Sequence, residues 1–320
     1  SATATVGDIN LDKTPPTVTG VPLAAPNEAG WYSGDVVVRW QVSDALSGVD
    51  PGAVPADAIV TSEGAALSAG PVSVADRAGN LATGLVEGIA IDRTPPAIAI
   101  AVPQAGQALP SGTALQFAAS DSLSDVAGIV GRLRRHGRAP IDVASGYTPT
   151  QGVYELTVIA VDRAGNTATE RRSFKVLPPH NAAVRGTGWF EATGRQHGWH
   201  SSDQAVFSFT CHFQEGSAAP TSRWPFLFRA SGVEFRSTRY EWLAVDDNGA
   251  HLGGRGLVNG SEECGFLASV AEGRRGNRDR IRVKIWRLSD STVVFDTQPG
   301  ADDLAAPATP LRGGRIDIRG

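Results

Sequence analysis

Hydrophobic and polar residues alternate along several short segments of the chain. Between residues 34 and 43, every second residue from Val36 to Val42 is apolar. A period of two places these side chains on one face of a β-strand. The same alternation occurs in two further segments, 114–120 and 280–286, and 154–162 is predicted to be a further strand. Beyond residue 182 no segment has the 3.6-residue period of a helix, and the pattern predicts an all-β chain.

A five-residue pattern, Asp-Lys/Arg-Thr-Pro-Pro, occurs at 12–16 and again at 92–96, which is an offset of 80 residues. The same offset aligns residues 1–16 with 81–96. The paired prolines remove two backbone donors and hold the chain extended, so a sheet ladder ends there. A repeat of this length with stiff joints predicts a tandem array of small β domains.

These patterns divide the chain into five parts. Residues 12–91 and 92–177 form two complete repeats, and residues 1–11 align with the last strand of a repeat. Residues 178–182 form a linker, and 183–320 form a different β domain, predicted to be a sandwich or a jelly roll. A strand without the rest of its repeat exposes unpaired backbone groups. We therefore expect 1–11 to pair with another element, such as one in a second copy of the chain.

Composition narrows the classes of function. Hydrophobic residues make up 41% of the chain and charged residues 19%, and the 37 glycines and 20 prolines suit a turn-rich β protein. The net charge of −4 comes without the basic stripe that nucleic-acid binding requires, so no nucleic-acid partner is expected. No apolar run approaches the roughly 20 residues that a membrane span needs. The lack of methionine and of a signal peptide suggests a processed product or a piece of a longer protein.

Several phrases in the first 177 residues resemble bacterial Ig-like repeats, which occur in large secreted and cell-surface proteins. They are GWYSGDVVV at 30–38, SDALSGV at 43–49, the two Asp-Arg-Ala-Gly-Asn turns at 76–80 and 162–166, and the two Thr-Pro-Pro joints. The resemblance implies two tandem Ig-like β-sandwiches. The second repeat departs from it, because Ser124-Asp125 replaces Ser-Gly and a basic stretch, Arg132–Arg138, is inserted. Such a stretch either contacts a partner or faces water. Tyr154, early in its strand, is a candidate tyrosine corner.

The last domain resembles a second module. Its phrases are GTGW at 186–189, YEWL at 240–243, VKIW at 283–286, VFDTQ at 294–298 and GGRIDI at 313–318. They are similar to the C-terminal post-COAP-like β domain that follows Ig-like and HYR repeats in secreted bacterial proteins. The resemblance implies an extracellular location and an all-β architecture. It implies no particular chemistry.

An Ig-type sandwich would gather acidic residues at one pole of each repeat, beside the Thr-Pro-Pro joint. The candidate set in the first repeat is Asp12, Asp44, Asp76 and Asn80. The candidate set in the second repeat is Asp92, Asp121, Asp162 and Asn166. Calcium takes six to eight oxygen ligands, so each set predicts a possible calcium site. The alternative is that these short side chains cap turns by accepting hydrogen bonds from nearby backbone N–H groups.

Cysteines and histidines offer further candidates. The chain has two cysteines, Cys211 and Cys264, and one pair in a protein of this kind predicts a disulfide formed in an oxidising compartment. Two free thiols are the alternative. His197 and His200 form an H-x-x-H pair with His212 nearby, but so loose a spacing favours surface histidines over zinc ligands.

Aromatic residues concentrate in the last domain. We consider Trp199, Trp224 and Trp286 as a platform on which sugar rings stack, whereas Phe209 and Trp242 fit core positions. No nucleophile, metalloprotease or phosphate-loop motif is present, and no catalytic or cofactor-binding residue is predicted. The doublets Asp246-Asp247 and Glu262-Glu263 place neighbours on opposite strand faces, so they are interpreted as solvated turn charges.

These features favour a non-catalytic structural or adhesive protein of a bacterial cell surface or matrix. In this interpretation the repeats are a spacer and the terminal β domain is the binding head. Two alternatives stay open. The chain is a self-assembling filament subunit that donates residues 1–11 to a neighbouring copy, or it is a carbohydrate-binding appendage of a secreted hydrolase. The expected partners are copies of the chain itself or cell-surface glycans.

Overall fold

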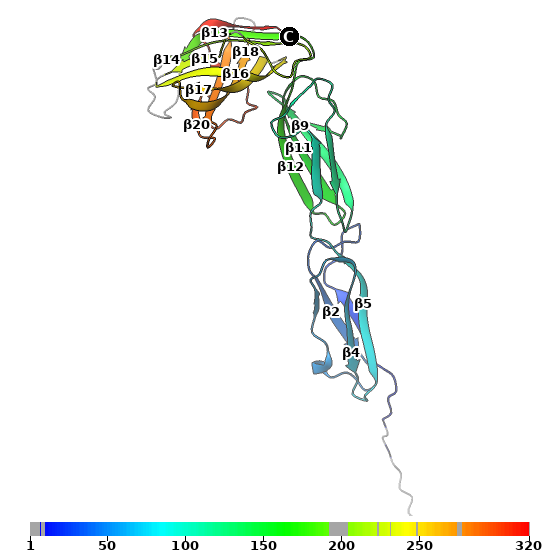
Figure 1. Cartoon of the computed structure of the whole chain (residues 1–320). Coiled ribbons are helices and arrows are strands. Elements are labelled where there is room, and N and C mark those ends of the chain that lie inside the picture. Colours follow the sequence, from blue (N-terminus) through cyan, green and yellow to red (C-terminus); the bar gives the residue numbers. More distant parts are fainter. Residues whose placement is uncertain are drawn as a thin grey trace, which may run out of the picture. The chain divides into compact units, whose positions relative to one another are not determined.

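The computed structural model describes residues 7, 10–191, 204–222, 224–230, 232–247, 249–273 and 277–319. Within these ranges the regular structure is β-strand, apart from one 3-10 turn at Pro51–Ala53 (Figure 1). The predicted all-β fold class is confirmed. In the same ranges, no helix has the length and hydrophobicity that crossing a membrane requires.

The chain divides into two compact units. Unit 1 holds residues 1–98 with 119–129 and 159–169, and unit 2 holds the remainder, including all of 170–320. The strands of each sheet fall within one of the expected repeats or domains, whereas this division passes through the second repeat. The expected domain boundaries therefore stay a prediction. Residues 1–11, apart from three positions, lie outside the described ranges.

The first repeat is built from two small sheets. One contains β1 (Thr17–Pro22), β2 (Val36–Ser43) and β3 (Ala58–Val60), and the other contains β4 (Gly64–Ala75) and β5 (Leu81–Ile91). The core between them draws Val36, Val38 and Trp40 from β2 and Ile89 and Ile91 from β5. The alternation in 36–42 therefore places the predicted face inward.

The second repeat also has two sheets. The smaller pairs β6 (Ala97–Val102) with β8 (Gln116–Ser120). The larger has the order β10-β9-β11-β12-β7, with the bounds Ile141–Val143, Val126–Arg135, Gly152–Asp162, Thr167–Val176 and Ala108–Leu109. Tyr154, near the start of β11, donates from its hydroxyl to the carbonyl oxygen of Thr150 at 2.9 Å. This is the hydrogen bond expected of a tyrosine corner.

The C-terminal domain is a ten-stranded, mainly antiparallel sheet. Its strands are β13 (Ala182–Glu191), β14 (Gln204–Phe213), β15 (Leu227–Ala230), β16 (Val233–Asp246), β17 (Gly249–Val258), β18 (Glu262–Ala271), β19 (Arg280–Arg287), β20 (Val293–Asp296), β21 (Thr309–Pro310) and β22 (Gly313–Arg319). From β13 to β20 each strand pairs with the next in sequence, and β22 pairs with β13 at the other edge. This order is a meander, and it differs from the Greek-key order of a jelly roll.

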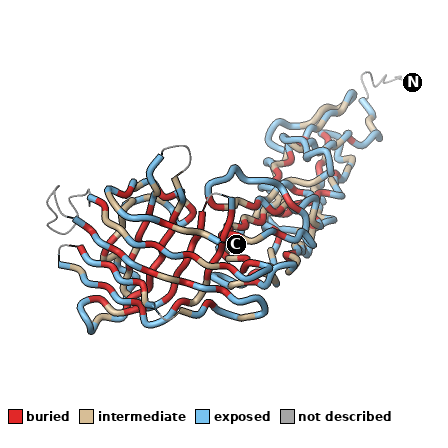
Figure 2. Tube along the Cα trace, turned by 90° about the horizontal axis from the view of Figure 1, so that it is seen from above, coloured by how far each residue is buried: buried red, intermediate tan, exposed pale blue. Residues whose placement is uncertain are grey.

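One hydrophobic core serves this whole sheet. Along β14, alternate residues from Ala205 to Phe213 are buried, so an entire face of that strand belongs to the core. Phe226 and Phe266 stack at its centre with ring centroids 5.1 Å apart. Figure 2 shows the buried residues concentrated along the strands and the exposed ones at the turns. Burial on this scale is the main stabilising contribution to the domain.

The predicted disulfide does not form. Cys211 on β14 and Cys264 on β18 are both free and both fully buried. Three strands, β15, β16 and β17, lie between them in the sheet order, so the cysteines do not face each other across a strand pair. Burial raises the pKa of the Cys264 thiol to about 11 and also raises the pKa of Cys211. Both cysteines are therefore neutral core residues.

Candidate functional sites

Each repeat gathers its expected aspartates at one place. The first aspartate cluster consists of Asp12, Asp44 and Asp76. The second aspartate cluster consists of Asp92, Asp121 and Asp162. Within each cluster, one carboxylate oxygen from every member lies within 4.8 Å of the others. All six belong to unit 1.

Backbone N–H groups donate hydrogen bonds to the carboxylates of the first aspartate cluster. Asp12 accepts from the backbone N–H of Thr14 at 2.9 Å and from that of Ser47 at 3.0 Å. Asp76 accepts two hydrogen bonds from Asn80, one from the Asn80 backbone N–H at 2.8 Å and one from the Asn80 side-chain Nδ2 at 2.8 Å. The carboxylates therefore cap the turns that bring the strands of the repeat together.

The second aspartate cluster repeats these hydrogen bonds. Asp92 accepts from Thr94 N at 3.0 Å and from Ser124 N at 3.2 Å. Asp162 accepts from Asn166 N at 2.8 Å and from its Nδ2 at 2.9 Å. The two repeats thus share a hydrogen-bonding pattern, although only the Asp12–Thr14 and Asp92–Thr94 segments keep the 80-residue offset.

The departure of the second repeat from the Ser-Gly pattern leaves this geometry intact. In the first repeat Gly48 has a φ of 73° and donates its N–H to Asp44 at 2.8 Å. In the second repeat Asp125 has a φ of 65° and donates its N–H to Asp121 at 3.1 Å. An aspartate tolerates this left-handed conformation better than most residues do, so the turn survives the substitution.

The two asparagines donate hydrogen bonds from their side-chain amides to backbone carbonyl oxygens of the clusters. Nδ2 of Asn80 lies 3.3 Å from the carbonyl oxygen of Asp12, and Nδ2 of Asn166 lies 3.0 Å from that of Asp92. Because the neighbouring carbonyl and carboxylate oxygens are all acceptors, the nitrogen of each amide must face them. Asn80 and Asn166 therefore donate hydrogen bonds that tie the turns together, and their role as calcium ligands stays a prediction.

Electrostatics within the first aspartate cluster follow the same pattern. Burial raises the pKa of Asp76 and so does the nearby charge of Asp12, yet the hydrogen bonds from Asn80 outweigh both and the pKa is lowered. The Asp76 carboxylate therefore stays ionised through hydrogen bonds within its own turn. Calcium binding at either cluster stays a prediction. A calcium-dependent rise in melting temperature that Asp76→Ala abolishes would support it.

Trp224 is the most exposed tryptophan among the described residues, with 69% of its surface accessible. Its backbone is held by hydrogen bonds to Ser222, at 3.1 Å from Trp224 N and 2.8 Å from Trp224 O, and by the hydroxyl of Tyr240, 3.3 Å from the same carbonyl oxygen. The chain is thus fixed on both sides while the indole projects into solvent.

Grooves lie on either side of Trp224. The larger has a volume of about 1120 Å³, and its polar lining includes Glu234, Arg236 and Thr238. These three alternate along the exposed face of β16. The second groove, of about 610 Å³, is lined by Trp224 together with Arg185 and His212. An exposed aromatic ring between polar grooves suits a ligand with both an apolar face and many hydroxyl groups.

The other platform candidates differ from Trp224. The ring of Trp286 fills the space above Gly265, where an added Cβ would lie 2.6 Å from it, and Lys284 Nζ lies 5.9 Å from the ring centroid. This half-buried ring therefore packs against the sheet. Trp199 lies outside the described residues, as do His197 and His200. The exposed His212 lines the second groove.

A third group of polar residues lies on the face of the C-terminal sheet opposite the hydrophobic core. In register, His251 of β17 pairs with Ser269 of β18, and Ser269 pairs with Arg282 of β19. All three are buried. Their cover is the loop between β20 and β21, residues 297–308, which we call the covering loop. Arg282 donates to the carbonyl oxygens of Ala301 and Asp302 in it.

The basic insertion of the second repeat packs against the same face. Arg134 lies 2.9 Å from Asp302 and Arg138 lies 3.2 Å from Asp247. The insertion therefore has a partner within its own chain. The interpretation of Asp246 as a solvated turn charge is wrong, because its side chain is fully buried.

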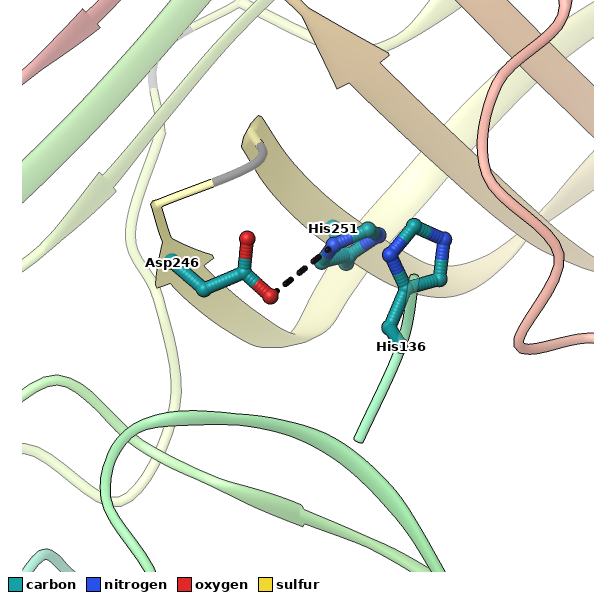
Figure 3. Close-up of side chains that lie close together, drawn as sticks. All are labelled: His136, Asp246 and His251. Atoms are coloured by element: carbon teal, nitrogen blue, oxygen red, sulfur yellow. Dashed lines mark ion pairs between the residues drawn. The ribbon is translucent and has the colours of Figure 1, made fainter. Parts of the chain in front are cut away.

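Figure 3 shows the centre of this packed face, where His136, Asp246 and His251 meet. Oδ2 of Asp246 lies 3.6 Å from Nε2 of His251, and the two imidazole centroids are 3.8 Å apart. Asp246 ends β16 and His251 lies in β17, directly opposite Ala244. Because Asp246 is two residues from Ala244, the strand pleat places it on the same face as His251.

Both imidazole rings are oriented by hydrogen bonds. Nε2 of His136 lies 2.8 Å from the carbonyl oxygen of Ala305, which can only accept, so Nε2 carries the proton. Nδ1 of His251 lies 3.0 Å from the hydroxyl of Ser269. Burial, helped by the adjacent His251, lowers the pKa of His136 to about 4. At neutral pH its ring therefore has an unprotonated nitrogen.

Sequence reasoning did not find this cluster. His136 lies inside the basic insertion, and His251 is one polar residue in a strand whose neighbours, Ala250 and Leu252, are apolar. A histidine with apolar neighbours on both sides in the strand was the available signal. Its partner lies more than 100 residues away, on the second repeat.

Comparisons with known proteins give little further guidance. No family model matches the chain, and no curated protein matches it. Among solved structures, the three N-terminal domains of the highly immunogenic outer capsid protein (Hoc) of bacteriophage RB49 are similar at 11% sequence identity with a TM-score of 0.26. That match covers 92% of this chain and 97% of the phage chain. At this TM-score the similarity carries no conclusion about function.

Proposed function

We propose that this chain is a non-catalytic structural and adhesive protein of a bacterial cell surface or extracellular matrix. In this proposal the two repeats are Ig-like spacers and the C-terminal domain binds a ligand, for which cell-surface glycans are the best candidates. The bacterial and extracellular setting rests on the sequence resemblances. The non-catalytic role rests on the lack of catalytic motifs in the sequence.

The observation that carries the adhesive role is the exposure of Trp224 between two grooves. A ring that is 69% accessible costs free energy in water, and here its backbone is held in place by Ser222 and Tyr240. Sugar rings present an apolar face to an indole and hydroxyl groups to charged neighbours such as Arg236. The lining of the larger groove offers both kinds of contact.

The spacer role is supported by the two aspartate clusters. Each is a network of short-range hydrogen bonds immediately beside a Thr-Pro-Pro joint. Proline-containing joints with capped turns have few accessible conformations, which is what a spacer needs.

A glycan-binding screen with the whole chain tests the adhesive role. We expect binding that Trp224→Ala removes and that Leu288→Ala leaves unchanged. Leu288 is an exposed apolar residue on the same domain that lines neither groove. A screen without any binding, or binding that survives Trp224→Ala, would count against the proposal.

The same groove is consistent with the alternative of a carbohydrate-binding appendage of a secreted hydrolase. Binding to insoluble polysaccharides and not to cell-surface glycans would favour that role. The filament alternative depends on residues 1–11, which lie largely outside the described ranges. Electron microscopy and gel filtration of residues 1–320 beside 12–320 would test it, because strand donation requires the assembly to disappear with the truncation.

A further inference from the structure

We propose that His136, Asp246 and His251 form a binding site for one divalent transition-metal ion of the zinc type. The ion would connect the turn that follows β9 to the β16–β17 hairpin. This site is separate from the groove at Trp224 and from both aspartate clusters.

The geometry fits such an ion. One ligand atom from each residue lies within 4.8 Å of the others, and His251 Nε2 is 3.6 Å from Asp246 Oδ2. Two ligands about 2.0–2.2 Å from a tetrahedral ion are roughly 3.4 Å apart, so small side-chain rotations would complete the site. Two imidazoles and one carboxylate are ligands typical of zinc, and they leave a fourth position for water.

A second, independent observation points to a missing ligand. Nδ1 of His136 and Nε2 of His251 are buried, and neither has a hydrogen-bond partner in the described part of the chain. Both residues are only 1% exposed. A buried polar atom without a partner costs free energy, and such atoms in folded proteins call for a specific explanation. A metal ion between the two rings would satisfy both nitrogens at once.

The opposite edge of each ring is arranged as in known metal sites. His136 donates its Nε2 proton to the carbonyl oxygen of Ala305, and His251 Nδ1 contacts the hydroxyl of Ser269. Metal-bound histidines usually donate their second N–H to a carbonyl or other acceptor, which sets the tautomer and aims the lone pair at the ion.

Two nearby cations are engaged by other groups. Arg282 lies 3.3 Å from Asp296 and donates to the covering loop. Arg135 donates from its Nη2 to the carbonyl oxygen of Gln151 at 2.8 Å, although its Nε lies 3.7 Å from Asp246. The carboxylate of Asp246 is thus paired with Arg135 as well as with His251. An ion at this site would also be attracted by the negative charge of that carboxylate.

Cobalt titration of the whole chain tests this proposal. The background variant carries His197→Gln and His200→Gln, so that the H-x-x-H pair cannot contribute. We expect one equivalent of Co²⁺ to bind with the visible absorption of a tetrahedral complex, and Zn²⁺ to displace it and raise the melting temperature. His136→Gln and His251→Gln should each weaken binding by more than about 100-fold, since removing a group that only hydrogen-bonds to a metal ligand already costs about 10–100-fold.

His180→Gln is the matched control, because its side chain is 80% exposed and distant in sequence from the cluster. It should leave the cobalt spectrum and the zinc-induced melting shift unchanged. Circular dichroism of each variant checks that it is folded. The proposal is overturned if the background protein binds no Co²⁺, whatever the variants do. It is also overturned if binding persists in a folded His136→Gln or His251→Gln variant.

Discussion

The guanidinium of Arg282 lies 3.3 Å from the carboxylate of Asp296, and the two side chains are 0% and 5% exposed. Arg282 belongs to β19, where Ile281 and Val283 point into the core as the sequence pattern predicts. Arg282 itself lies on the opposite face of the strand. The covering loop instead closes over it and accepts hydrogen bonds from Nη1 and Nη2 through the carbonyl oxygens of Asp302 and Ala301.

We predict that Arg282→Ala destabilises the C-terminal domain by about 3–5 kcal/mol, since it leaves Asp296 as a buried charge without its partner. The measurement is chemical unfolding followed by tryptophan fluorescence. Arg280→Ala is the control, because Arg280 lies two residues away on the same strand face and is exposed. Its effect should stay within about 0.5 kcal/mol. Equal effects of the two substitutions would mean that the covering loop does not close in solution.

The two cysteines provide a second prediction. Because Cys211 and Cys264 are free and buried, a reducing agent should leave the melting temperature unchanged. Both thiols should resist a thiol-specific reagent in the folded protein and react after unfolding, since burial raises the pKa of each. Mass spectrometry of the alkylated protein gives the number of thiols that have reacted before and after unfolding. A melting temperature that falls on reduction would contradict this prediction and indicate that Cys211 and Cys264 form a disulfide.

The sequence is most informative where a structural feature is local. The alternation in 36–42 predicts the buried face of β2, and the position of Asp76 in its turn predicts the hydrogen bonds that cap it. Both depend on residues within a few positions of one another. The repeat offset extends such predictions to the second repeat, because the same local pattern occurs there.

The sequence is least informative where a distant segment changes the surroundings of a residue. Arg282 reads as a solvent-facing residue because only a loop at 297–308 buries it. His251 acquires a partner from the second repeat, which no local pattern predicts. The disulfide prediction failed for a related reason. The spacing of Cys211 and Cys264 in sequence does not reveal how many strands will lie between them in the sheet.

The first aspartate cluster predicts a specific pH dependence. The folded-state pKa of Asp76 lies below its ordinary value of 3.8, against the effect of burial and because Asn80 donates two hydrogen bonds. A lowered carboxyl pKa contributes stability above pH 3.8, and this contribution is lost as the pH falls through the folded-state pKa.

Asn80→Ala should therefore lower the free energy of unfolding of the first repeat at pH 7. The difference in this free energy between the variant and the parent should become smaller as the pH falls below about 3.8 and Asp76 becomes protonated. Urea unfolding at a series of pH values measures this. Asn27→Ala, which alters a different turn of the same repeat, is the control and should show no such narrowing. If the free-energy difference between Asn80→Ala and the parent stays constant down to the lowest pH, the amide of Asn80 does not stabilise the ionised form of Asp76.

The contact between β11 and the covering loop gives the last prediction. Val153 of β11 and Leu304 of the covering loop share a small hydrophobic cluster with Ala244 of β16, and all three are at least 93% buried. Leu304→Ala should cost about 2–5 kcal/mol, because it removes buried methyl groups and leaves a cavity. Val153→Ala should cost less, as fewer atoms are lost.

The double variant distinguishes a real contact from two independent core positions. Side chains that pack against each other share the same cavity, so the cost of both substitutions should differ from the sum of the single costs by about 0.5–3 kcal/mol. Leu304→Ala combined with Leu288→Ala is the matched pair, since Leu288 is exposed and outside the cluster, and those effects should add. Additivity for Val153 and Leu304 as well would mean that the second repeat and the C-terminal sheet do not pack together here. The cluster of His136 and His251, which depends on the same packing, would then lose its structural basis.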